Sequence, residues 1–479
     1  MKKTILMILA ALLALPGFPG ELRLAGVFSD NMVLQRETAC PVWGWAAPGA
    51  RVSVSVSWSR KAVSAVADAD GRWRVSVRTP EAGGPYTMTV RSGKERLERR
   101  DILSGEVWVC SGQSNMQMPV AGFSRQLVEG SREALLRAPA MADRIRIFKV
   151  DADTTQIPQA DVKAAWKKAS GNMAAYTSAV AYFFAERLAE GLDVPVGIVV
   201  NAWGGSRIAA WMEAETVESL RGTVPEEQLA KTLAERNGKA YPVQVQSLWN
   251  GRMLPIAGYA ARGFLWYQGE SDIEDMYYDR VQAAMVARWR EVWGCGEMPF
   301  LFVTLAPYSY GKSAGEKRPR FIEVQLRSLK EIPSSYAAIT ESLGREHSIH
   351  PPKKQEIADQ FAFIALDKVY GREMATSSFP YPVKYTFADG KAVIEFGNAP
   401  FGVGNWDVPR ITGFELAGED RVFHPAQATA GGDWSRFVTV TCPEVPEPVA
   451  VRYAFHNYVE SNLFSTLGIP VPCFRSDDW

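Results

Sequence analysis

The sequence is poor in histidine, and its cysteines follow no pattern typical of a metal site or a disulfide-rich scaffold. Four His and five Cys occur among 479 residues. The number of thiols is odd, their spacing is wide, and no C-x-x-C motif is present. These features argue against a disulfide framework and against a cysteine-based zinc site. Pairing of Cys442 with Cys473 is left open.

The chain has no net charge and no long hydrophobic run. Lys and Arg together number 53, as do Asp and Glu, so charge gives no reason to expect a nucleic acid or an anionic membrane as partner. One apolar run, residues 4–15, follows Lys2 and Lys3 and ends at Pro16 to Gly20. This pattern predicts a secretory signal peptide at residues 1–20, hence a secreted or periplasmic protein without a membrane span.

The length favours several domains, and the sequence pattern changes twice along the chain. Residues 21–100 contain "ARVSVSVSW" and "GRWRVSVRT", in which apolar and polar residues alternate. We expect a β-sandwich domain there. Residues 371–479 are again rich in strand patterns, including a hairpin around Asp389-Gly390, and predict a β-rich domain.

Between them, residues 101–370 alternate short apolar runs with longer amphipathic stretches. "EVWVCS", "VPVGIVVN" and "RGFLWYQ" are typical of buried parallel strands, and "TSAVAYFFAERLAEGL" shows helical spacing. The alternation predicts an α/β fold in which helices cover both faces of a parallel sheet. We expect the active site at the carboxyl ends of its strands.

A candidate nucleophile follows the first of these strands. In "EVWVCSGQSNM", a strand enters a tight turn that Gly112 permits and that exposes Ser114. A capping serine in a turn is the structural alternative. Ser313 lies in a G-x-S-x-G match, but its polar, Pro-flanked surroundings predict an exposed loop rather than a nucleophile elbow.

A serine nucleophile needs a base, and the scarcity of histidine narrows the choice. His347 and His350 lie together between an expected strand and an expected helix, whereas His424 and His456 belong to the terminal β region. One of the first two is therefore the candidate base. An H-x-x-H zinc site is disfavoured, because two prolines follow His350 and no further ligand cluster is present.

Two further loops follow expected strands. The loop "NAWGGSR" places glycine N–H groups, including that of Gly205, where they can approach a substrate oxygen, and Gln268 in "WYQGESD" can donate a side-chain N–H to the same oxygen. Glu270 and Asp272 raise the alternative of a two-carboxylate glycosidase, which leaves the serine and histidine motifs unexplained.

Together these four loops resemble the sialate O-acetylesterase family of SGNH-type hydrolases. The matching segments are "SGQSNM", "WGGSRIAAW", "WYQGESD" and "HSIHPPKKQEIADQFA", and the flanking β regions are also similar to bacterial members. The resemblance implies an SGNH-like, flavodoxin-like parallel-sheet hydrolase domain, flanked by the N-terminal β-sandwich and the C-terminal β-rich domain. It implies neither a metal nor another cofactor.

The resemblance also implies roles for individual residues. Ser114 is expected as nucleophile and His350 as base. The oxyanion hole is expected from the backbone N–H groups of Ser114 and Gly205 and from the Gln268 side chain. The family usually has an acidic residue three positions before the histidine, where this chain has His347, so either Glu346 orients the imidazole or a Ser–His dyad operates. The remaining residues expected to contact substrate are Asn115, Trp203 and Glu270.

The predicted function is therefore that of a secreted serine esterase that removes O-acetyl groups from a carbohydrate. The resemblance implies acetylated sialic acid as substrate, and an esterase of acetyl-xylan or another hemicellulose is an alternative. A non-catalytic carbohydrate-binding protein on a degenerate hydrolase scaffold is a further one. Three aromatic residues are candidate sugar contacts or core residues: Trp211, Trp266 and Tyr267. Oligomeric state has no signal in the sequence.

Overall fold

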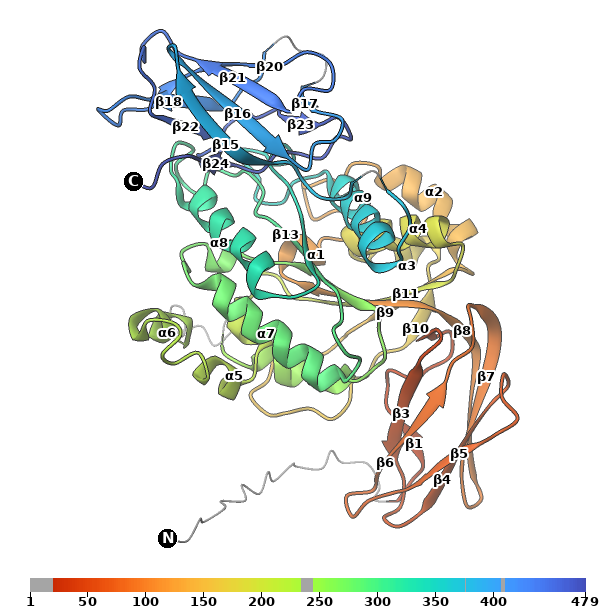
Figure 1. Cartoon of the computed structure of the whole chain (residues 1–479). Helices are drawn as coiled ribbons and strands as arrows, with labels where there is room; N and C mark the ends of the chain where they lie inside the picture. The colour runs from red at the N-terminus through yellow and green to blue at the C-terminus, as the bar shows by residue number, and fades with distance from the viewer. Residues whose placement is uncertain (1–19, 234–243, 375, 406–409) are drawn as a thin grey trace, which may run out of the picture.

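The computed structural model describes residues 20–233, 244–374, 376–405 and 410–479 (Figure 1). Residues 1–19 of the expected signal peptide lie outside these ranges. In the described part of the chain, no helix has both the length and the apolar character needed to cross a membrane. The helices and strands form a mixed α/β fold with several sheets.

The N-terminal strands form two sheets, which are antiparallel except for one parallel pair. Residues alternate along β4 (Arg51–Val56): the valines at 52, 54 and 56 are buried and Arg51 is exposed, which is the period-two pattern of a strand with one face toward a core. One sheet contains β1 (Arg23–Leu24), β3 (Ala39–Trp45) and β6 (Arg72–Arg78); the other contains β2 (Val33–Gln35), β4, β5 (Val63–Val66), β7 (Gly83–Ser92) and the first half of β8.

Strand β8 (Glu95–Gly112) belongs to two parts of the fold. Its first half pairs with β7, and its second half becomes the central strand of a parallel sheet. The expected domain boundary at residue 100 therefore lies inside one continuous strand. This strand carries the chain directly from the N-terminal β region to the loop that contains Ser114.

The central sheet has the strand order β10-β9-β11-β8-β12-β13-β14. All neighbouring pairs are parallel except β10 with β9, which is antiparallel. The bounds are β9 (Ile145–Lys149), β10 (Trp166–Lys168), β11 (Val196–Ala202), β12 (Gly263–Tyr267), β13 (Phe300–Val303) and β14 (Ser335–Ala338). Because the chain moves to one side of β8 first and to the other side later, β8 lies at the topological switch point, where open α/β sheets bind their ligands.

Helices cover both faces of this sheet, as expected. Along β8, Val107 and Val109 join one hydrophobic cluster, whereas Trp108 and Cys110 join another. The first cluster includes residues of α7 (Tyr278–Trp293) and α8 (Lys317–Glu331), and the second includes residues of α4 (Ala179–Leu192) and α9 (Lys354–Ile364) (Figure 1). A strand that is buried on both faces consists of a nearly continuous run of apolar residues, which explains the apolar character of "EVWVCS".

Shorter elements complete the α/β region. They are α1 (Ser114–Gln117), α2 (Ser131–Met141), α3 (Gly171–Ala175), α5 (Ala214–Glu218), α6 (Glu226–Leu233), η1 (Ile208–Trp211), η3 (Trp249–Met253), η4 (Leu254–Ile256), η5 (Glu270–Asp272) and η6 (Ala365–Val369). Helix α4 is capped by the Ser178 hydroxyl, which accepts from the Ala181 N–H at 3.2 Å.

The C-terminal region consists of small antiparallel sheets. The hairpin expected around Asp389-Gly390 is present, and both residues have positive φ, as a tight two-residue turn requires. One sheet has the order β15 (Tyr381–Ala388), β16 (Lys391–Gly397), β21 (Phe437–Thr441) and β20 (Gln427–Ala430). Another has the order β19 (His424–Pro425), β18 (Phe414–Ala417), β22 (Ala450–Tyr453) and β24 (Phe474–Arg475), and β17 (Val403–Gly404) pairs with β23 (Phe464–Ser465).

A buried ion pair connects this region to the α/β region. Arg318 of α8 binds Glu341 at 2.7 Å, and the same guanidinium donates to the carbonyls of Ala454 and His456 after β22. Removing one partner of such a pair leaves a buried charge uncompensated, so the pair fixes the relative position of the two regions. All five cysteine thiols are free, and Cys442 and Cys473 form no disulfide in this structure.

Candidate active site

Ser114 lies directly beyond the carboxyl end of β8. Gly112 at the strand end has φ = +140°, and a Cβ there would lie 2.2 Å from the carbonyl oxygen of Tyr267 on the neighbouring strand β12. The next N–H, that of Gln113, donates to the same carbonyl at 2.9 Å. Only glycine permits this close approach. The turn leads into the short helix α1, and Ser114 at its start is half-buried and reachable from outside.

The structure brings His350 to this serine. The Nε2 atom of His350 lies 2.8 Å from the Ser114 Oγ, although the two residues are 236 positions apart. His350 comes from the loop between β14 and α9, which also begins at the carboxyl edge of the sheet. The expected pairing of the early serine with the late histidine is therefore observed as a direct contact.

Gln126, a residue that sequence reasoning did not single out, binds the other side of the imidazole. Its Oε1 lies 2.8 Å from His350 Nδ1, and the Phe123 ring packs edge-on against the imidazole at 5.3 Å between centroids. An amide oxygen only accepts hydrogen bonds, so Nδ1 carries the proton and Nε2 presents its lone pair to Ser114. This is the tautomer that a general base requires.

Glu346 does not orient His350 in this structure, which corrects the expectation for that residue. Its carboxylate accepts from the Ser313 hydroxyl at 2.6 Å and lies 3.6 Å from Nε2 of the exposed His347. The loop around residues 345–348 turns back on itself and directs Glu346 away from the site. Ser313, the serine of the G-x-S-x-G match, thus has a carboxylate partner and follows no strand.

The backbone N–H groups of Ser114 and Gly205 are the expected oxyanion donors. The glycine loop follows β11, and a Cβ on Gly204 would lie 3.5 Å from the Ser114 Cβ, so this loop borders the serine. Gly204 donates to the Gln117 side chain at 2.9 Å, whereas Gly205 adopts φ = +71°. Within the described residues, the N–H groups of Ser114 and Gly205 have no hydrogen-bond acceptor from the protein.

Gln268 does not supply the expected third donor. It is fully buried, and its Nε2 lies within 3.1 Å of three acceptors: Gln113 Oε1, the Ser206 carbonyl and Asp272 Oδ2. Its Oε1 accepts from the Tyr278 hydroxyl at 2.6 Å. Both amide hydrogens therefore have protein acceptors. Gln268 connects the serine loop, through Gln113, to the glycine loop, through Ser206.

Asn115 and Glu270 form a hydrogen bond beside the serine, with Asn115 buried and Glu270 half-buried. The buried Asn115 amide donates to Glu270 Oε1 and, at 3.1 Å, to the Ile349 carbonyl of the histidine loop. Its Oδ1 accepts from the ammonium of Lys354, a residue that the sequence analysis missed. Lys354 is fully buried at the start of α9. In the sequence, the signal for this residue was a lysine on the apolar face of an expected helix.

Burial shifts the pKa values of Lys354, Glu270 and His350. It lowers the pKa of Lys354 to about 7, against the opposing effect of the nearby Glu270, whose own pKa is raised by burial. The pKa of His350 is lowered to about 4, first by burial and second by the charge of Lys354. At neutral pH the imidazole is therefore uncharged and competent to accept a proton.

Of the other residues proposed to contact substrate, three pack in the core and one lines a cavity. Trp211, Trp266 and Tyr267 are at most 1% exposed and pack in the core, so none of them contacts a ligand in this arrangement. Trp203 is half-buried and lines a cavity of about 750 Å³ next to the glycine loop, with the Arg252 guanidinium 5.0 Å from its ring centre.

The glycosidase alternative does not fit the positions of its carboxylates. Asp272 is buried, binds Arg207 at 3.0 Å and accepts from the Ile208 N–H at 2.8 Å. Glu270 is half-buried, and its carboxylate accepts from the Asn115 amide. Acid and base catalysis on a sugar would need both groups at an open cleft.

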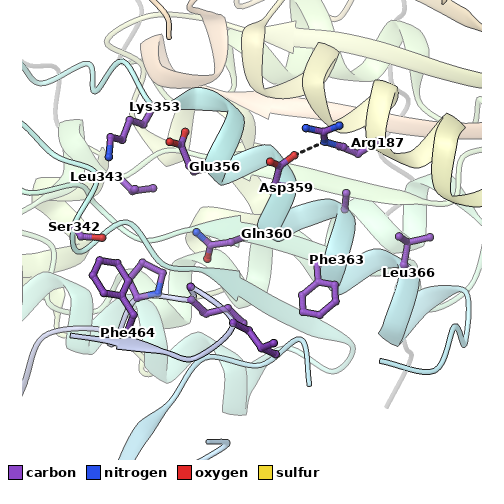
Figure 2. A pocket seen from close by; sticks show the side chains of 15 residues that line it. Arg187, Ser342, Leu343, Lys353, Glu356, Asp359, Gln360, Phe363, Leu366 and Phe464 are labelled. Atoms are coloured by element: carbon purple, nitrogen blue, oxygen red, sulfur yellow. Dashed lines mark hydrogen bonds and ion pairs between the residues drawn. The ribbon is translucent and has the colours of Figure 1, made fainter. Parts of the chain in front are cut away.

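A separate apolar cavity lies on the outer side of α9. Its volume is about 630 Å³, and it opens between α9 and residues 464–470, with Phe363 and Leu366 on its wall and the Arg187–Asp359 ion pair at 2.7 Å beside it (Figure 2). Neither Ser114 nor His350 lines it.

Comparison with known proteins identifies the family of this chain. The model of the family described as carbohydrate esterase, sialic acid-specific acetylesterase, matches residues 104–357, which include all the loops described above. The chain belongs to this family. It is accordingly a carboxylic ester hydrolase of the sialate O-acetylesterase type.

Individual relatives match over most of the chain. The sialate O-acetylesterases of Pongo abelii and Homo sapiens are 29% and 28% identical to it over an alignment of 412 positions, which covers 78% of this chain and 76% of each relative. The crystal structure of XAC1771, described as a novel carbohydrate acetylesterase from Xanthomonas citri, is 33% identical, with a TM-score of 0.83 over 95% of this chain and 100% of that one. The likeness thus extends beyond the α/β region to the flanking β regions.

Proposed function

We propose that this protein hydrolyses acetyl esters of carbohydrates with Ser114 as nucleophile and His350 as general base. The observation that carries the proposal is the 2.8 Å contact between Ser114 Oγ and His350 Nε2 at the switch point of the sheet. The unused N–H groups of Ser114 and Gly205 support it, because ester hydrolysis needs donors where negative charge develops.

In the acylation step, His350 Nε2 takes the hydroxyl proton while Ser114 Oγ bonds to the acetyl carbonyl carbon. The carbonyl oxygen becomes an oxyanion that accepts from the Ser114 and Gly205 N–H groups. The bond between the carbonyl carbon and the sugar oxygen then breaks, and His350 returns its proton to that oxygen. The deacetylated sugar leaves, and the acetyl group stays on Ser114.

In the deacylation step, a water molecule replaces the sugar. His350 takes a proton from the water as its oxygen attacks the acetyl-serine carbonyl, and the same donors bind the second oxyanion. The bond to Ser114 Oγ breaks, the proton passes from His350 to Oγ, and acetate is released. The neutral state of His350 at physiological pH allows it to act as base in both steps.

Gln126 would hold the imidazole in its catalytic orientation without adding charge. In a carboxylate triad the acid also stabilises the imidazolium that forms in the transition state. An amide provides the orientation and the tautomer, but only a dipole toward the positive charge. We therefore propose an oriented Ser–His pair in place of the Glu346-assisted arrangement or a simple dyad.

The first candidate substrate is an O-acetylated sialic acid, because the family description and the curated relatives name this substrate class. A second candidate is another acetylated carbohydrate, such as acetyl-xylan. It is supported by the relative from Xanthomonas citri, which is described as a carbohydrate acetylesterase without mention of sialate. The non-catalytic alternative is disfavoured by the preserved contact between serine and histidine.

Acetate release separates these candidates. Wild type, Ser114→Ala and His350→Ala are assayed on p-nitrophenyl acetate, a 9-O-acetylated sialoside and acetyl-xylan. The proposal predicts turnover by the wild type and its loss in both variants. Equal turnover by wild type and Ser114→Ala would remove the assignment, and preference between the two carbohydrates identifies the natural ester.

Export of the protein is part of the proposal and is supported by the sequence of residues 1–20 alone. Expression of the full chain followed by N-terminal sequencing of the extracytoplasmic protein tests it. A start near Glu21 is expected. Retention of Met1 in a cytoplasmic product would contradict it.

A further inference from the structure

A groove lined by Gln117 and Trp203, from the loops that border Ser114, runs over the ends of the neighbouring strands. The 750 Å³ cavity is floored by Val150, Val200 and Ala202, at and beyond the carboxyl ends of β9 and β11. Strand β11 pairs with β8, and Ala202 is in register with Gly112, two residues before Ser114. The cavity therefore continues the same edge of the sheet that presents the serine.

The walls of this cavity are joined to the catalytic loops. Gln117 lines it and binds the Gly204 N–H of the glycine loop. Tyr176 and Ser178 form another wall, and their segment is hydrogen-bonded to the residues after α1: Val120 donates to the Thr177 carbonyl, and Pro119 pairs with Ser178. The loop that starts there also carries Gln126, the partner of His350.

A second cavity extends the first. Its volume is about 700 Å³, and the two cavities share the lining residues Asp151, Ala152, Asp153 and Lys163. The second reaches Arg23 of β1, whose guanidinium binds Asp161 at 2.7 Å and stacks on the Trp45 ring at 3.5 Å. Each cavity alone has the volume of a typical small-ligand pocket, ~300–1,000 Å³. Together they form a path from the glycine loop, which borders the serine, to the N-terminal β region.

The segment between the two cavities is held rigidly by its backbone. Residues 151–165 have no regular secondary structure, and segments of this length in a compact fold are usually either functional or disordered linkers. Thr155 and Gln159 donate their N–H groups to carbonyls of residues 247 and 250, and Arg252 donates to the carbonyls of Val150 and Ala152. The backbone of the segment is thus fixed by protein contacts.

Its side chains remain available. Asp151 and Lys163 are exposed, and within the described residues neither forms a hydrogen bond or ion pair with another side chain. The carboxylates of Asp151 and Asp153 can accept from sugar hydroxyls, and the Lys163 ammonium can donate to them. Trp203 and the exposed Tyr176 add aromatic surface at the end nearest Ser114. This combination of apolar rings and fixed polar groups suits a polyhydroxylated chain.

From these observations we infer that the groove binds an oligosaccharide, whose acetylated unit lies at Ser114 and whose further sugar units extend over Asp151, Asp153 and Lys163 toward Arg23. The inference rests on the proposed function and adds to it the size of the substrate: a chain of sugar units rather than a single sugar. The N-terminal β region thereby contributes to the substrate site.

The test compares short and long substrates within two series. One series is acetylated xylose against acetylated xylohexaose, and the other is free 9-O-acetyl-N-acetylneuraminic acid against the same sugar in sialyllactose. Acetate release gives kcat/KM for each, and p-nitrophenyl acetate is measured in every variant as reference. The wild type is expected to prefer the longer member at least about tenfold in one series, the size of one charged hydrogen bond.

Lys163→Met and Asp153→Asn are expected to reduce that preference about tenfold each, as the ratio of long to short substrate. Lys384→Met, which alters an exposed lysine on β15, is the matched control and leaves the ratio unchanged. Equal kcat/KM for short and long members in both series overturns the inference while the proposed function stands. Absence of acetate release from every carbohydrate, with or without p-nitrophenyl acetate turnover, overturns both.

Discussion

His350 donates its Nδ1 hydrogen to a neutral amide, the side chain of Gln126, at 2.8 Å. The two residues come from loops that follow different strands, and their contact fixes the imidazole beside Ser114. Under the proposed mechanism, the protein therefore orients its base with an amide dipole rather than with a carboxylate.

Gln126→Glu tests this statement with a nearly isosteric change. A carboxylate beside the imidazole should raise the pKa of His350 by about one to three units and stabilise the imidazolium. We expect the acid limb of the kcat/KM profile to move to higher pH and kcat above that limb to increase about tenfold. Gln126→Ala is expected to lower kcat. Profiles for all three forms on p-nitrophenyl acetate decide the point, and a Gln126→Ala variant with wild-type kcat would contradict the role of the amide.

Gly205→Ala tests the oxyanion donors. Gly205 has φ = +71°, so a side chain forces the backbone to move and displaces its N–H from the oxyanion position. Losing one such donor costs about 2.7–4 kcal/mol of transition-state stabilisation, so kcat is expected to fall by about 10²–10³-fold.

The matched control is Gly222→Ala. Gly222 has φ = +83° in an exposed turn, and a Cβ at either glycine would meet no atom within 4 Å. The two variants thus carry the same kind of backbone strain, and both should lower the melting temperature slightly. Equal loss of kcat in both would show that strain, and not a missing donor, accounts for the effect.

Lys354→Met tests whether the charge of Lys354 lowers the pKa of His350. The ammonium of Lys354 is the second cause, after burial, of the low pKa of His350. Its removal should raise the pKa of His350 and move the acid limb of kcat/KM from near pH 4 to higher pH. A disturbance of the structure alone would lower activity without changing the pH of the acid limb of kcat/KM. Lys353→Met, at the half-buried neighbouring lysine, is the control and should leave the limb in place.

The double variant Lys354→Met/Glu270→Gln separates the charge from the contact. Lys354→Met alone removes the cation that favours the charged form of the half-buried Glu270, which is destabilising. Neutralising both residues should recover stability while the limb stays at the higher pH. A limb that returns to its wild-type position in the double variant would contradict the proposed effect of Lys354.

The lowered pKa of Lys354 also predicts how the free energy of unfolding depends on pH. Its pKa falls from the ordinary 10.5 to about 7 in the folded protein. Between these values the unfolded chain binds more protons, so this residue makes the free energy of unfolding rise as pH increases from 7 to 10.5. We expect a contribution of roughly a few kcal/mol across this window. Urea unfolding of wild type and Lys354→Met at pH 7 and pH 10 measures it, and parallel pH dependence of the two would contradict it.

The sequence was sufficient to predict that Ser114 and His350 meet, for physical reasons. Ser114 follows an apolar run with a glycine in the turn, and only four histidines compete for the role of base. The alternation of strands and helices likewise predicted a parallel sheet with both faces covered, and thus the edge at which the residues meet. These features depend on local pattern and on the rarity of one residue type.

The partners of these residues could not be predicted in the same way. Gln126 is a neutral amide in a loop, and nothing in its neighbourhood marks it as the partner of a histidine 224 positions away. Glu346 was favoured by proximity along the chain, but the direction of a loop side chain depends on tertiary contacts. Gln268, Asn115 and Glu270 lie in or beside the catalytic loops, and sequence cannot tell whether such residues face the substrate or the core. Strand β8 crosses the expected boundary because an unbroken strand carries no boundary signal.

The most direct test of the account is detection of the acetyl group on Ser114. Wild-type protein is mixed with p-nitrophenyl acetate, quenched in acid within the first turnover and digested for mass spectrometry. The account predicts acetylation of the peptide at Ser114, its absence in Ser114→Ala, and a fall in kcat of about 10⁶-fold in that variant. An unmodified Ser114 during rapid turnover, or turnover that survives Ser114→Ala, would contradict it.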